Sequence, residues 1–485
     1  MATVDDHRDG PRDECGVFGI YAPGADVARL AYFGLFALQH RGQESAGIAS
    51  SSADGSILAI RDQGLVSQVF DEHMLRSLVG DLAIGHTRYS TTGSSAWENT
   101  QPIVRDDNRT LALAHNGNLI NAVELHAELR AQDVPFSSTS DSEIIAAMLS
   151  THPAEKIEDA VADVLPRLKG AFSTVVMTRT KVVAFRDPQG LRPLAIGKMP
   201  SETGGPDIYC VASESCAFDL IGATYVRPVQ PGELITLDRN GLSSRLVATG
   251  QRRAFCVFEH IYFARPDSLM GGQRLQVSRA RMGEILWREA PVDADLVIPV
   301  PDSGNAAARG LARESGLPTD DGFIKNRYVA RTFIQPGQQL RKHGLRLKFN
   351  PLPEVVSGKR LVVVDDSIVR GNTTRQIVQM LRDAGAAEVH LRITAPPIKH
   401  PCYYGIDMST REEMIAHNRT SAEIAAEVGA DSLHYLSLEG VYEAIRGQRD
   451  EHCDACFTGE YPLGDTSDHG GKFALEKSLP MAGGR

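Results

Sequence analysis

The fold of this chain is decided by the stretch Leu361-Val362-Val363-Val364-Asp365-Asp366-Ser367-Ile368-Val369-Arg370-Gly371-Asn372-Thr373-Thr374. An apolar, β-branched run ends in two carboxylates and passes into a loop with one glycine and several hydroxyl groups. The pattern predicts a buried parallel strand over residues 361–364, a loop, and a helix over residues 376–384. Such a loop and helix N-terminus can hold a phosphate, and the carboxylates suit ribose hydroxyls with Mg²⁺ beside them. We therefore expect a site for a ribose that carries a phosphate; the alternative is a plain strand–turn–helix with solvated carboxylates.

The same succession of strand, loop and helix occurs upstream of this stretch. Residues 296–300 form another continuous apolar run, and the helix-like segment Asn305–Ser315 follows it. This repetition predicts an α/β domain with a mostly parallel sheet. Residues 15 to about 245 instead hold short apolar runs separated by Gly, Asn, Ser and Pro, which predicts many strands and a few helices. The strands expected there include residues 16–21, 82–85, 110–115, 174–177 and 181–185, with a helix over residues 141–149.

Length and composition limit the classes of protein to which the chain can belong. A chain of 485 residues exceeds what one core usually serves, so we expect two or three domains. The net charge of −10 argues against a general nucleic-acid or membrane-surface binder, and no apolar run approaches the roughly 18 residues that span a bilayer. Residues 1–14 are polar and lack the apolar core of a secretory signal, so we expect a cytoplasmic protein.

Residues 361–374 resemble the phosphoribosyl pyrophosphate (PRPP) loop of the type I phosphoribosyltransferases. The resemblance implies PRPP binding by Asp365, Asp366, Ser367, Arg370, Gly371, Thr373 and Thr374. Ser303 lies in the loop after the other apolar strand and matches a Mg²⁺ position alongside Asp365 and Asp366. On spacing alone, a plain helix cap is the alternative for Ser303.

A basic segment, residues 325–348, lies between the two phosphate-binding loops. It holds seven Lys or Arg residues, with Pro336 and Gly337 near its middle. Long basic loops are usually just solvated, but the place of this one favours a lid that closes over pyrophosphate. Lys325 and Arg331 are the expected polyphosphate contacts, because cations must neutralise the leaving pyrophosphate.

Cys15 lies at the edge of the first expected strand. By its position alone it could be a small buried apolar residue. Three polar motifs follow it: Gln-His-Arg-Gly-Gln-Glu-Ser-Ala-Gly at 39–47, Gly-His-Thr-Arg-Tyr-Ser-Thr at 85–91, and Ala-His-Asn-Gly-Asn-Leu at 114–119. Together with Asp141, these motifs resemble the class II glutamine amidotransferases, whose nucleophile is an N-terminal residue.

This resemblance implies a mechanism for the N-terminal half. Removal of a propeptide, residues 1–14, would free the α-amino group of Cys15 to act as the base for its own thiol. Asn116 and the Gly117 N–H match the oxyanion-hole donors. Arg88 matches the group that holds the glutamine carboxylate, and Asp141 the partner of the glutamine ammonium. The alternatives are a hairpin turn at residues 116–117, a surface charge for Arg88 and a helix cap for Asp141.

The two halves together resemble the amidophosphoribosyltransferase family. Residues 256–268, 331–338 and 404–408 match that family as well. The resemblance implies that ammonia from glutamine attacks C1 of PRPP, giving 5-phosphoribosylamine and pyrophosphate in the first step of de novo purine nucleotide synthesis. It also implies a homotetramer, feedback inhibition by purine nucleotides, and an ammonia passage lined by Tyr262 and Ile334, which could equally be core residues. One departure is Asn372-Thr373-Thr374, where the family often has Thr-Thr-Ser.

The fold class that follows is an N-terminal-nucleophile αββα sandwich and then a type I phosphoribosyltransferase α/β domain. The expected divisions are a propeptide at 1–14, an amidotransferase domain at 15–248, a phosphoribosyltransferase domain at 249–460 and a disordered tail at 461–485.

The other cysteines suggest a metal site. Cys453 and Cys456 form a C-x-x-C motif that by itself fits zinc, a redox pair or an iron–sulfur cluster. Cys256 and Cys402 lie in segments that match the cluster-containing branch of the family. The resemblance therefore implies a structural [4Fe–4S] cluster on these four thiolates, with zinc as the alternative. Cys210 and Cys216 have no partner motif, and we expect them to pack in the core.

A regulator that binds PRPP and acts through nucleic acid is the alternative from another class of protein. Such a regulator would need a basic face or an added DNA-binding module. The negative net charge of the chain and the amidotransferase motifs argue against it. Glutamine-dependent sugar isomerase–aminase and asparagine synthetase share the N-terminal half, but neither would carry residues 364–367 with their phosphate loop.

Overall fold

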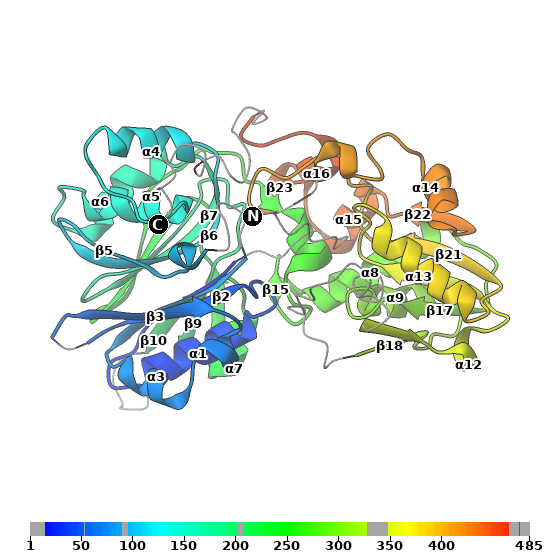
Figure 1. The fold of residues 1–485 in the computed structure, drawn as a ribbon, viewed down its shortest axis with the longest axis horizontal. Coiled ribbons are helices and arrows are strands. Elements are labelled where there is room, and N and C mark those ends of the chain that lie inside the picture. Colours follow the sequence, from blue (N-terminus) through cyan, green and yellow to red (C-terminus); the bar gives the residue numbers. More distant parts are fainter. Residues whose placement is uncertain are drawn as a thin grey trace, which may run out of the picture.

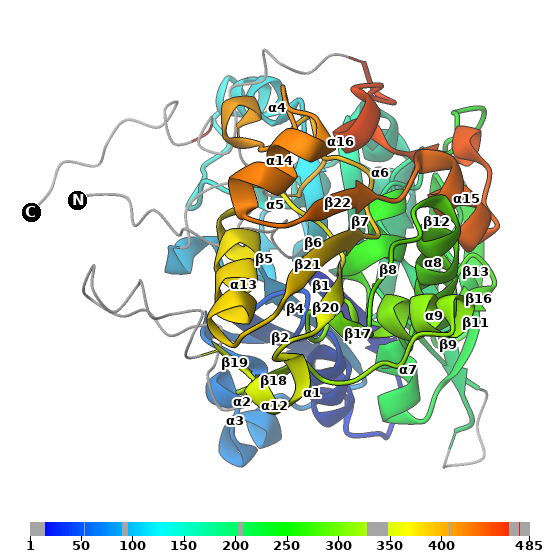
Figure 2. The ribbon, with the colours of Figure 1, turned by 90° about the vertical axis from the view of Figure 1, so that its right-hand side faces the viewer.

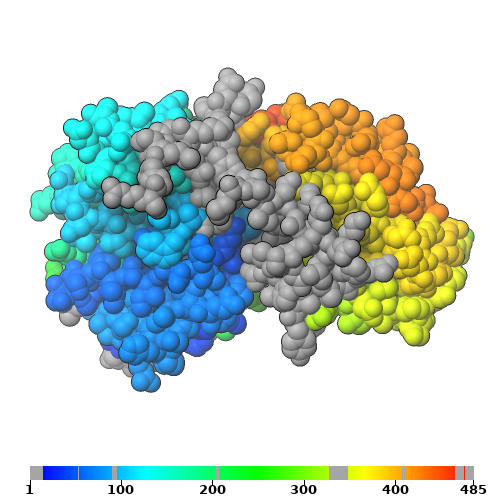
Figure 3. All heavy atoms as spheres, in the orientation of Figure 1, coloured from blue at the N-terminus to red at the C-terminus, as the bar shows by residue number. Residues whose placement is uncertain are grey.

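The computed structural model describes residues 15–52, 54–89, 96–201, 207–326, 348–406, 408, 410–464 and 475. These residues form two lobes, drawn side by side as ribbons in Figure 1 and as atomic spheres in Figure 3. Strands β1 to β13 belong to the N-terminal lobe, and the sheet β17 to β22 belongs to the C-terminal lobe. No helix of the described residues is long and apolar enough to cross a membrane.

The N-terminal lobe contains two stacked antiparallel sheets. The first has the strand order β11 (Thr224–Pro228), β9 (Ala195–Met199), β10 (Ile208–Ala212), β1 (Gly16–Tyr21), β4 (Leu82–Arg88), β2 (Ser45–Ser51) and β3 (Ile57–Gln63). The second has the order β13 (Gly241–Leu246), β12 (Glu233–Asp238), β8 (Val182–Arg186), β7 (Gly170–Met177), β6 (Thr110–Leu119) and β5 (Ile103–Asp106). Apolar side chains from both sheets, such as Val17, Ala114 and Val175, form the core between them.

Helices cover the outer faces of both sheets and complete an αββα sandwich. The first sheet is covered by α1 (Val27–Ala37), α2 (Val66–Val69), α3 (Glu72–Ser77) and α7 (Cys216–Ile221). The second is covered by α4 (Ala122–Arg130), α5 (Asp141–Ser150) and α6 (Ile157–Val164). The two helical layers lie at the bottom and the top of the left lobe in Figure 1.

The C-terminal lobe is built on a parallel sheet with the order β17 (Leu296–Pro299), β20 (Arg360–Asp365), β21 (Glu388–Ile393) and β22 (Ser432–Tyr435). Its helices are α8 (Leu275–Glu289), α9 (Asn305–Ser315), α12 (Pro353–Val356), α13 (Asn372–Asp383), α14 (Ser421–Val428), α15 (Leu438–Ile445) and α16 (Ala455–Thr458). Figure 2 shows α13 and α14 on one side of this sheet and α8 and α9 on the other. The side chains of β20 alternate accordingly, with Val362 and Val364 packed against α9 and Val363 against the other core.

Three short strand pairs complete the structure: β14 (Phe255–Cys256) with β23 (His452–Cys453), β15 (Leu269–Met270) with β16 (Gln273–Arg274), and β18 (Phe323–Lys325) with β19 (Phe349–Pro351). In Figure 1, β15 and β23 lie between the two lobes. The C-terminal lobe is therefore joined to the sandwich by a structured junction.

The predicted fold class is confirmed, and two elements match their predicted limits, β1 and α9. Helix α13 begins at Asn372, four residues before its predicted start, because Gly371 turns the chain directly into the helix with φ of 79°. Strands β4 and β6 are longer than predicted and reach Arg88 and Leu119. The proposed propeptide, Arg331, Ile334 and most of the tail lie outside the described residues.

Candidate active sites

Cys15 lies directly before β1, at the centre of the first sheet. Antiparallel pairing of β1 with β4 sets Gly16 opposite Thr87, so the cysteine comes beside Arg88 and Tyr89. Its Sγ donates a hydrogen bond to the carbonyl oxygen of Tyr89 at 3.3 Å, and the residue is 5% exposed. Burial raises the pKa of the Cys15 thiol to about 11, although the positive charge of Arg88 acts in the opposite direction. The thiol is therefore protonated at neutral pH and needs a base before it can attack.

Arg88 and Asp141 lie within electrostatic reach of this thiol. Both affect the pKa of Cys15, and each is only 3% exposed. The surface-charge alternative for Arg88 is therefore wrong. Asp141 is the first residue of α5, and its Oδ2 accepts a hydrogen bond from the Leu119 N–H at 2.9 Å. The cap of α5 is Ser140, so the carboxylate of Asp141 has another task.

Asn116 and Gly117 lie inside β6, where they pair with Ser173 and Phe172 of β7. The hairpin-turn alternative is therefore wrong. Among the described residues, neither polar atom of the buried Asn116 side chain has a hydrogen-bond partner. A buried amide without partners is costly, so its position favours a ligand oxygen. Gly117 has φ of 149°, and a Cβ there would lie 1.9 Å from the Ala171 carbonyl oxygen, so only glycine fits.

The second candidate site lies at the carboxyl ends of β17 and β20. These strands are parallel neighbours, so the loops that follow them meet at one edge of the sheet. Ser303, after β17, donates its hydroxyl hydrogen to Asp365 Oδ1 at 3.2 Å. Helix α9 is capped by Gly304 without a side-chain bond, so the helix-cap alternative for Ser303 is wrong. Burial, followed by the adjacent charge of Asp366, holds the pKa of Asp365 well above its usual range, which favours a bound cation.

The loop after these carboxylates leads into the N-terminus of α13. Gly371 is the N-cap in a left-handed conformation, and Thr373 and Thr374 lie in the first turn. A Cβ on Gly371 would lie 2.4 Å from Ile415 Cδ1, so the close approach of the loop also requires glycine. The first N–H groups of an α-helix have no acceptor within the helix itself, and together with the helix dipole they make such a turn suitable for a phosphate.

Two further cations lie near this edge. Lys325 ends β18 and pairs with Asp302, next to Ser303, so it lies at the second candidate site. Arg370 donates to Glu413 Oε2 at 3.0 Å.

Tyr262 lies in a π-helical turn, η3 (Glu259–Phe263), in the junction between the lobes, and packs against the C-terminal core.

The four cysteines of the expected cluster come together at the junction. Pairing of β14 with β23 sets Cys256 opposite Cys453, and Cys456 follows in α16. Burial raises the pKa of Cys453 to about 12, and the negative charge of Cys402 adds to the shift. The pKa of Cys456 is raised by burial and by the other three thiolates. All seven cysteines are free, and no group of three or more His, Cys, Asp or Glu among the described residues could hold a metal ion.

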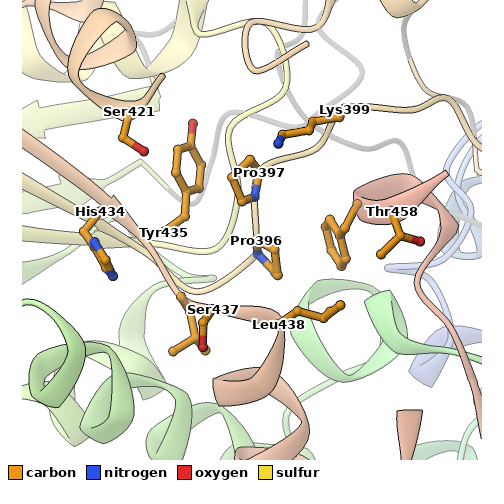
Figure 4. Close-up of a pocket in the computed structure, with 11 residues that line it drawn as sticks. Pro396, Pro397, Lys399, Ser421, His434, Tyr435, Ser437, Leu438 and Thr458 are labelled. Atoms are coloured by element: carbon orange, nitrogen blue, oxygen red, sulfur yellow. The ribbon is translucent and has the colours of Figure 1, made fainter. Parts of the chain in front are cut away.

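A separate cavity of about 280 Å³ lies beside β22 (Figure 4). It is lined by residues of the C-terminal lobe that include Lys399, Ser421 and His434. No residue of the two candidate sites lines it, so we assign no part of the chemistry to it.

Sequence reasoning assigned no task to Arg41, whose Nε donates to the Cys15 carbonyl oxygen at 3.1 Å. It also missed Glu214 and Glu259, whose carboxylates hold Arg41. The available signal was a charged residue inside the motif at 39–47; its partners are more than 170 residues away and leave no local pattern.

An αββα sandwich with a buried cysteine at the start of its central strand, joined to an α/β domain with a parallel sheet, is the architecture of a glutamine amidotransferase fused to a phosphoribosyltransferase. Comparison with known families agrees: residues 86–219 match the glutamine amidotransferase domain and residues 276–414 the phosphoribosyl transferase domain. The chain belongs to the amidophosphoribosyltransferase family. It is 51% identical to the amidophosphoribosyltransferase of Synechococcus elongatus, over 94% of this chain and 92% of that protein. It is 47% identical to that of Bacillus subtilis, over 93% and 95%.

Solved structures support the same assignment. One, described as the allosteric regulatory enzyme of purine biosynthesis, superposes with a TM-score of 0.88 at 46% identity, covering 94% of this chain and 97% of that one. Glutamine PRPP amidotransferase from B. subtilis in complex with ADP and GMP superposes with a TM-score of 0.86 at 46% identity, covering 92% and 97%.

Proposed function

We infer that this enzyme transfers ammonia from glutamine to C1 of PRPP, giving 5-phosphoribosylamine, glutamate and pyrophosphate in the first step of de novo purine nucleotide synthesis. The observation that carries this conclusion is the presence of both sites in one chain of this family. Cys15, Arg88 and Asp141 gather at one buried point of the sandwich. Ser303 and Asp365 meet at the sheet edge of the other lobe.

In the amidotransferase half we assign Cys15 as the nucleophile. Its nitrogen is an amide in the full-length chain and cannot accept a proton, but removal of residues 1–14 would turn it into an amine with a pKa of about 7.7–8. That amine would take the thiol proton, and the thiolate would attack the glutamine amide. The unpartnered Asn116 amide and the Gly117 N–H would donate to the resulting oxyanion. Release of ammonia would leave a glutamyl thioester for water to hydrolyse.

Two charged residues would hold the glutamine substrate. The guanidinium of Arg88 suits the α-carboxylate, because its planar fork makes two parallel hydrogen bonds. Asp141 suits the α-ammonium, since its second oxygen is already fixed by the Leu119 N–H. Both side chains are buried and prepared for one substrate orientation.

In the phosphoribosyltransferase half we assign Asp365 and Asp366 to the ribose hydroxyls. Ser367, Arg370, Gly371, Thr373 and Thr374 would surround the 5-phosphate at the start of α13. A Mg²⁺ ion held near Ser303, Asp365 and Asp366 would neutralise charge on the pyrophosphate, and the raised pKa of Asp365 fits a site that needs a cation. Lys325, together with Arg331, which lies outside the described residues, would contact the same pyrophosphate.

Ammonia would pass between the sites inside the protein. Tyr262 lies in the junction between the lobes, which supports its assignment to that passage together with Ile334. An internal route matters because free ammonia is mostly protonated at neutral pH and then cannot act as a nucleophile.

We propose that Cys256, Cys402, Cys453 and Cys456 hold a [4Fe–4S] cluster. The residues fit such a group, because Cys256 and Cys456 are buried and burial, followed by the charges of neighbouring thiolates, raises the pKa of Cys456. Burial also raises the pKa of Cys256 and Cys453, and the buried guanidinium of Arg192 opposes that shift. Zinc bound by the same thiolates is the alternative. The cluster would be structural, since amide transfer moves no electrons. Cluster and propeptide together would place the chain in the iron–sulfur branch of the family.

We also propose that the enzyme is a cytoplasmic homotetramer inhibited by purine nucleotides. The complex of the B. subtilis relative with ADP and GMP supports nucleotide binding. The expected divisions, 15–248 and 249–460 with flanking segments 1–14 and 461–485, remain our proposal for the domain limits.

The test is the release of glutamate and pyrophosphate from glutamine, PRPP and Mg²⁺ by processed protein kept away from oxygen. Equal amounts of the two products would support the coupled reaction. Glutamate without pyrophosphate would point to a glutaminase with another acceptor, and the absence of both products from processed protein would contradict the proposal.

A further inference from the structure

Two arginines and two glutamates form a buried group between the lobes. This junction quartet consists of Arg41, Glu214, Glu259 and Arg279, which are 1%, 1%, 0% and 5% exposed. Burying a single charge without a partner is costly, so such groups are found paired. The charges of the two arginines and the two glutamates balance here, and His40 contacts the same Glu214 carboxylate from its outer side, with Nε2 at 2.7 Å from Oε1.

Arg41 is the member that reaches the amidotransferase site. Its Nε donates to the carbonyl oxygen of Cys15 at 3.1 Å. Its two terminal nitrogens donate to the two carboxylate oxygens of Glu259 at 3.1 and 2.7 Å, and one of them also donates to Glu214 at 2.5 Å. Because a guanidinium is rigid and planar, these bonds fix the direction in which Nε points. The residue that carries the thiol is thereby held through its own carbonyl group.

Glu214 and Glu259 come to Arg41 from different parts of the chain. Glu214 follows β10 in the sandwich, and it is fixed further by the Ser268 hydroxyl at 2.7 Å. Glu259 begins η3 in the junction. Arg279, on α8, donates to the carbonyl oxygens of His260 at 2.9 Å and Ala264 at 2.7 Å, and so holds that turn from the C-terminal lobe. The amidotransferase site thus takes one of its supporting carboxylates from outside the sandwich.

We propose that Glu259 is a positioning residue for glutamine cleavage, acting on Cys15 through Arg41. The inference rests on the proposed role of Cys15 as nucleophile. Without the Glu259 carboxylate, Arg41 loses both bonds to that side chain, keeps its bond to Glu214 and can rotate toward it. The Cys15 carbonyl then loses its fixed donor, and the thiol is no longer held in line with the oxyanion pocket at Asn116. A displacement of about 1 Å at a reacting atom can cost roughly a hundredfold in rate.

The test compares Glu259→Gln with Glu233→Gln in the processed, full-length enzyme. Glu233 is a matched control, since it is 4% exposed and accepts two hydrogen bonds from Arg227, at 2.8 and 2.7 Å, away from both sites. For Glu259→Gln we expect kcat with glutamine to fall about 10- to 100-fold while the glutamine KM stays within about twofold, because Arg88 and Asp141 are unchanged. PRPP turnover with ammonia should stay within about twofold, as should both activities of Glu233→Gln.

Alkylation of Cys15 by iodoacetamide, followed on its peptide by mass spectrometry, provides a readout independent of turnover. We expect its rate to change several-fold in Glu259→Gln and in Arg41→Lys, and to match the wild type in Glu233→Gln. Equal loss of the glutamine and ammonia activities in Glu259→Gln, or wild-type kcat with glutamine, would overturn the proposal. If the wild-type enzyme releases no glutamate, or Cys15→Ser still cleaves glutamine, the proposed function itself fails, and with it this inference.

Discussion

At the residue scale, the mechanism that we propose for Cys15 depends on two atoms of that residue, the thiol sulfur and the backbone nitrogen. The buried Sγ has a raised pKa, so it needs a base close by. The residue's own nitrogen can supply that base only after cleavage of the bond to Glu14. Because the thiol and the backbone nitrogen have different roles in this mechanism, each can be tested by its own experiment.

The substitution Cys15→Ser removes the thiolate and leaves the rest of the pocket in place. We expect glutamine-dependent glutamate release to fall roughly a thousandfold or more, while pyrophosphate release with ammonia stays within about twofold. Cys210→Ser is the control, since Cys210 is a buried thiol of β10 away from the pocket, and it should keep both activities. Equal loss of both activities in Cys15→Ser would contradict separate sites.

The complementary substitution is Asp366→Asn, which removes a carboxylate assigned to the ribose of PRPP. We expect pyrophosphate release to fall about a hundredfold with either glutamine or ammonia as nitrogen source, because both routes use the same electrophile. Assays with each nitrogen source at saturating PRPP would measure this. A loss confined to glutamine would be inconsistent with the assignment.

The raised pKa of Cys15 also predicts how the unprocessed chain responds to pH. With a pKa of about 11, roughly one thiol in 3,000 is ionised at pH 7.5. While residues 1–14 remain attached, alkylation of Cys15 by iodoacetamide should therefore rise about tenfold per pH unit from pH 7 to 10. Mass spectrometry of the Cys15 peptide would give the rates. A plateau below pH 9 would show that the buried thiol has an ordinary pKa.

At the element scale, the phosphate site depends on the turn from β20 into α13. Gly371 makes that turn with positive φ and leaves no room for a Cβ beside Ile415. Gly316, which ends α9, has a similar φ of 73°, but nothing lies within 4 Å of the place its Cβ would take. Alanine substitutions at the two positions therefore separate the effect of backbone strain, which both share, from that of a steric clash, which only Gly371 has.

For Gly371→Ala we expect the free energy of unfolding to fall by about 2–4 kcal/mol and the KM for PRPP to rise at least about tenfold, because strain and overpacking combine at the phosphate loop. Gly316→Ala should cost only about 1 kcal/mol and leave this KM unchanged. Denaturant unfolding and initial rates would measure both quantities. An unchanged KM for PRPP in Gly371→Ala would show that this loop is not part of the PRPP-binding site.

Elements with a strong local pattern could be predicted from the sequence, and others could not. The apolar run before Asp365 and the segment at α9 carry their own periodicity and lie where expected. The Asn116-Gly117 pair has turn chemistry by itself, but pairing with β7 keeps it inside a strand. The bond between Ser303 and Asp365 requires two loops separated by 62 residues to meet, which only the resemblance to a known family could suggest. For the quartet, the motif at 39–47 offers the charge of Arg41, but the two carboxylates that pair with it are more than 170 residues away and leave no local pattern.

At the scale of the whole molecule, the four cluster cysteines tie the last described segments to the junction. Cys256 and Cys453 come from paired strands, and the partly buried side chain of Asn118 in the sandwich donates to the Tyr403 carbonyl at 2.9 Å, next to Cys402. A metal centre at this place would stabilise contacts between the lobes.

We therefore expect protein prepared without oxygen to contain about four iron atoms per chain. Air exposure that removes the iron should lower the Tm and abolish activity, and Cys453→Ser should reproduce both effects, whereas Cys216→Ser should not. Metal analysis, calorimetry and turnover would provide the measurements. One zinc per chain would favour the alternative metal, and full activity after loss of iron would contradict a structural cluster.

The bond from Arg41 to Glu259 has a consequence for how such a protein can change through evolution. The halves look like interchangeable modules, yet each contributes one charge of a buried pair. A gene fusion that replaced one half with that of a distant homologue would remove one of the two carboxylates that pair with the buried Arg41, unless Arg41 and Glu259 were inherited together. Descent of the two halves is thus linked, and recombination between residues 41 and 259 should succeed only among parents that share this pair.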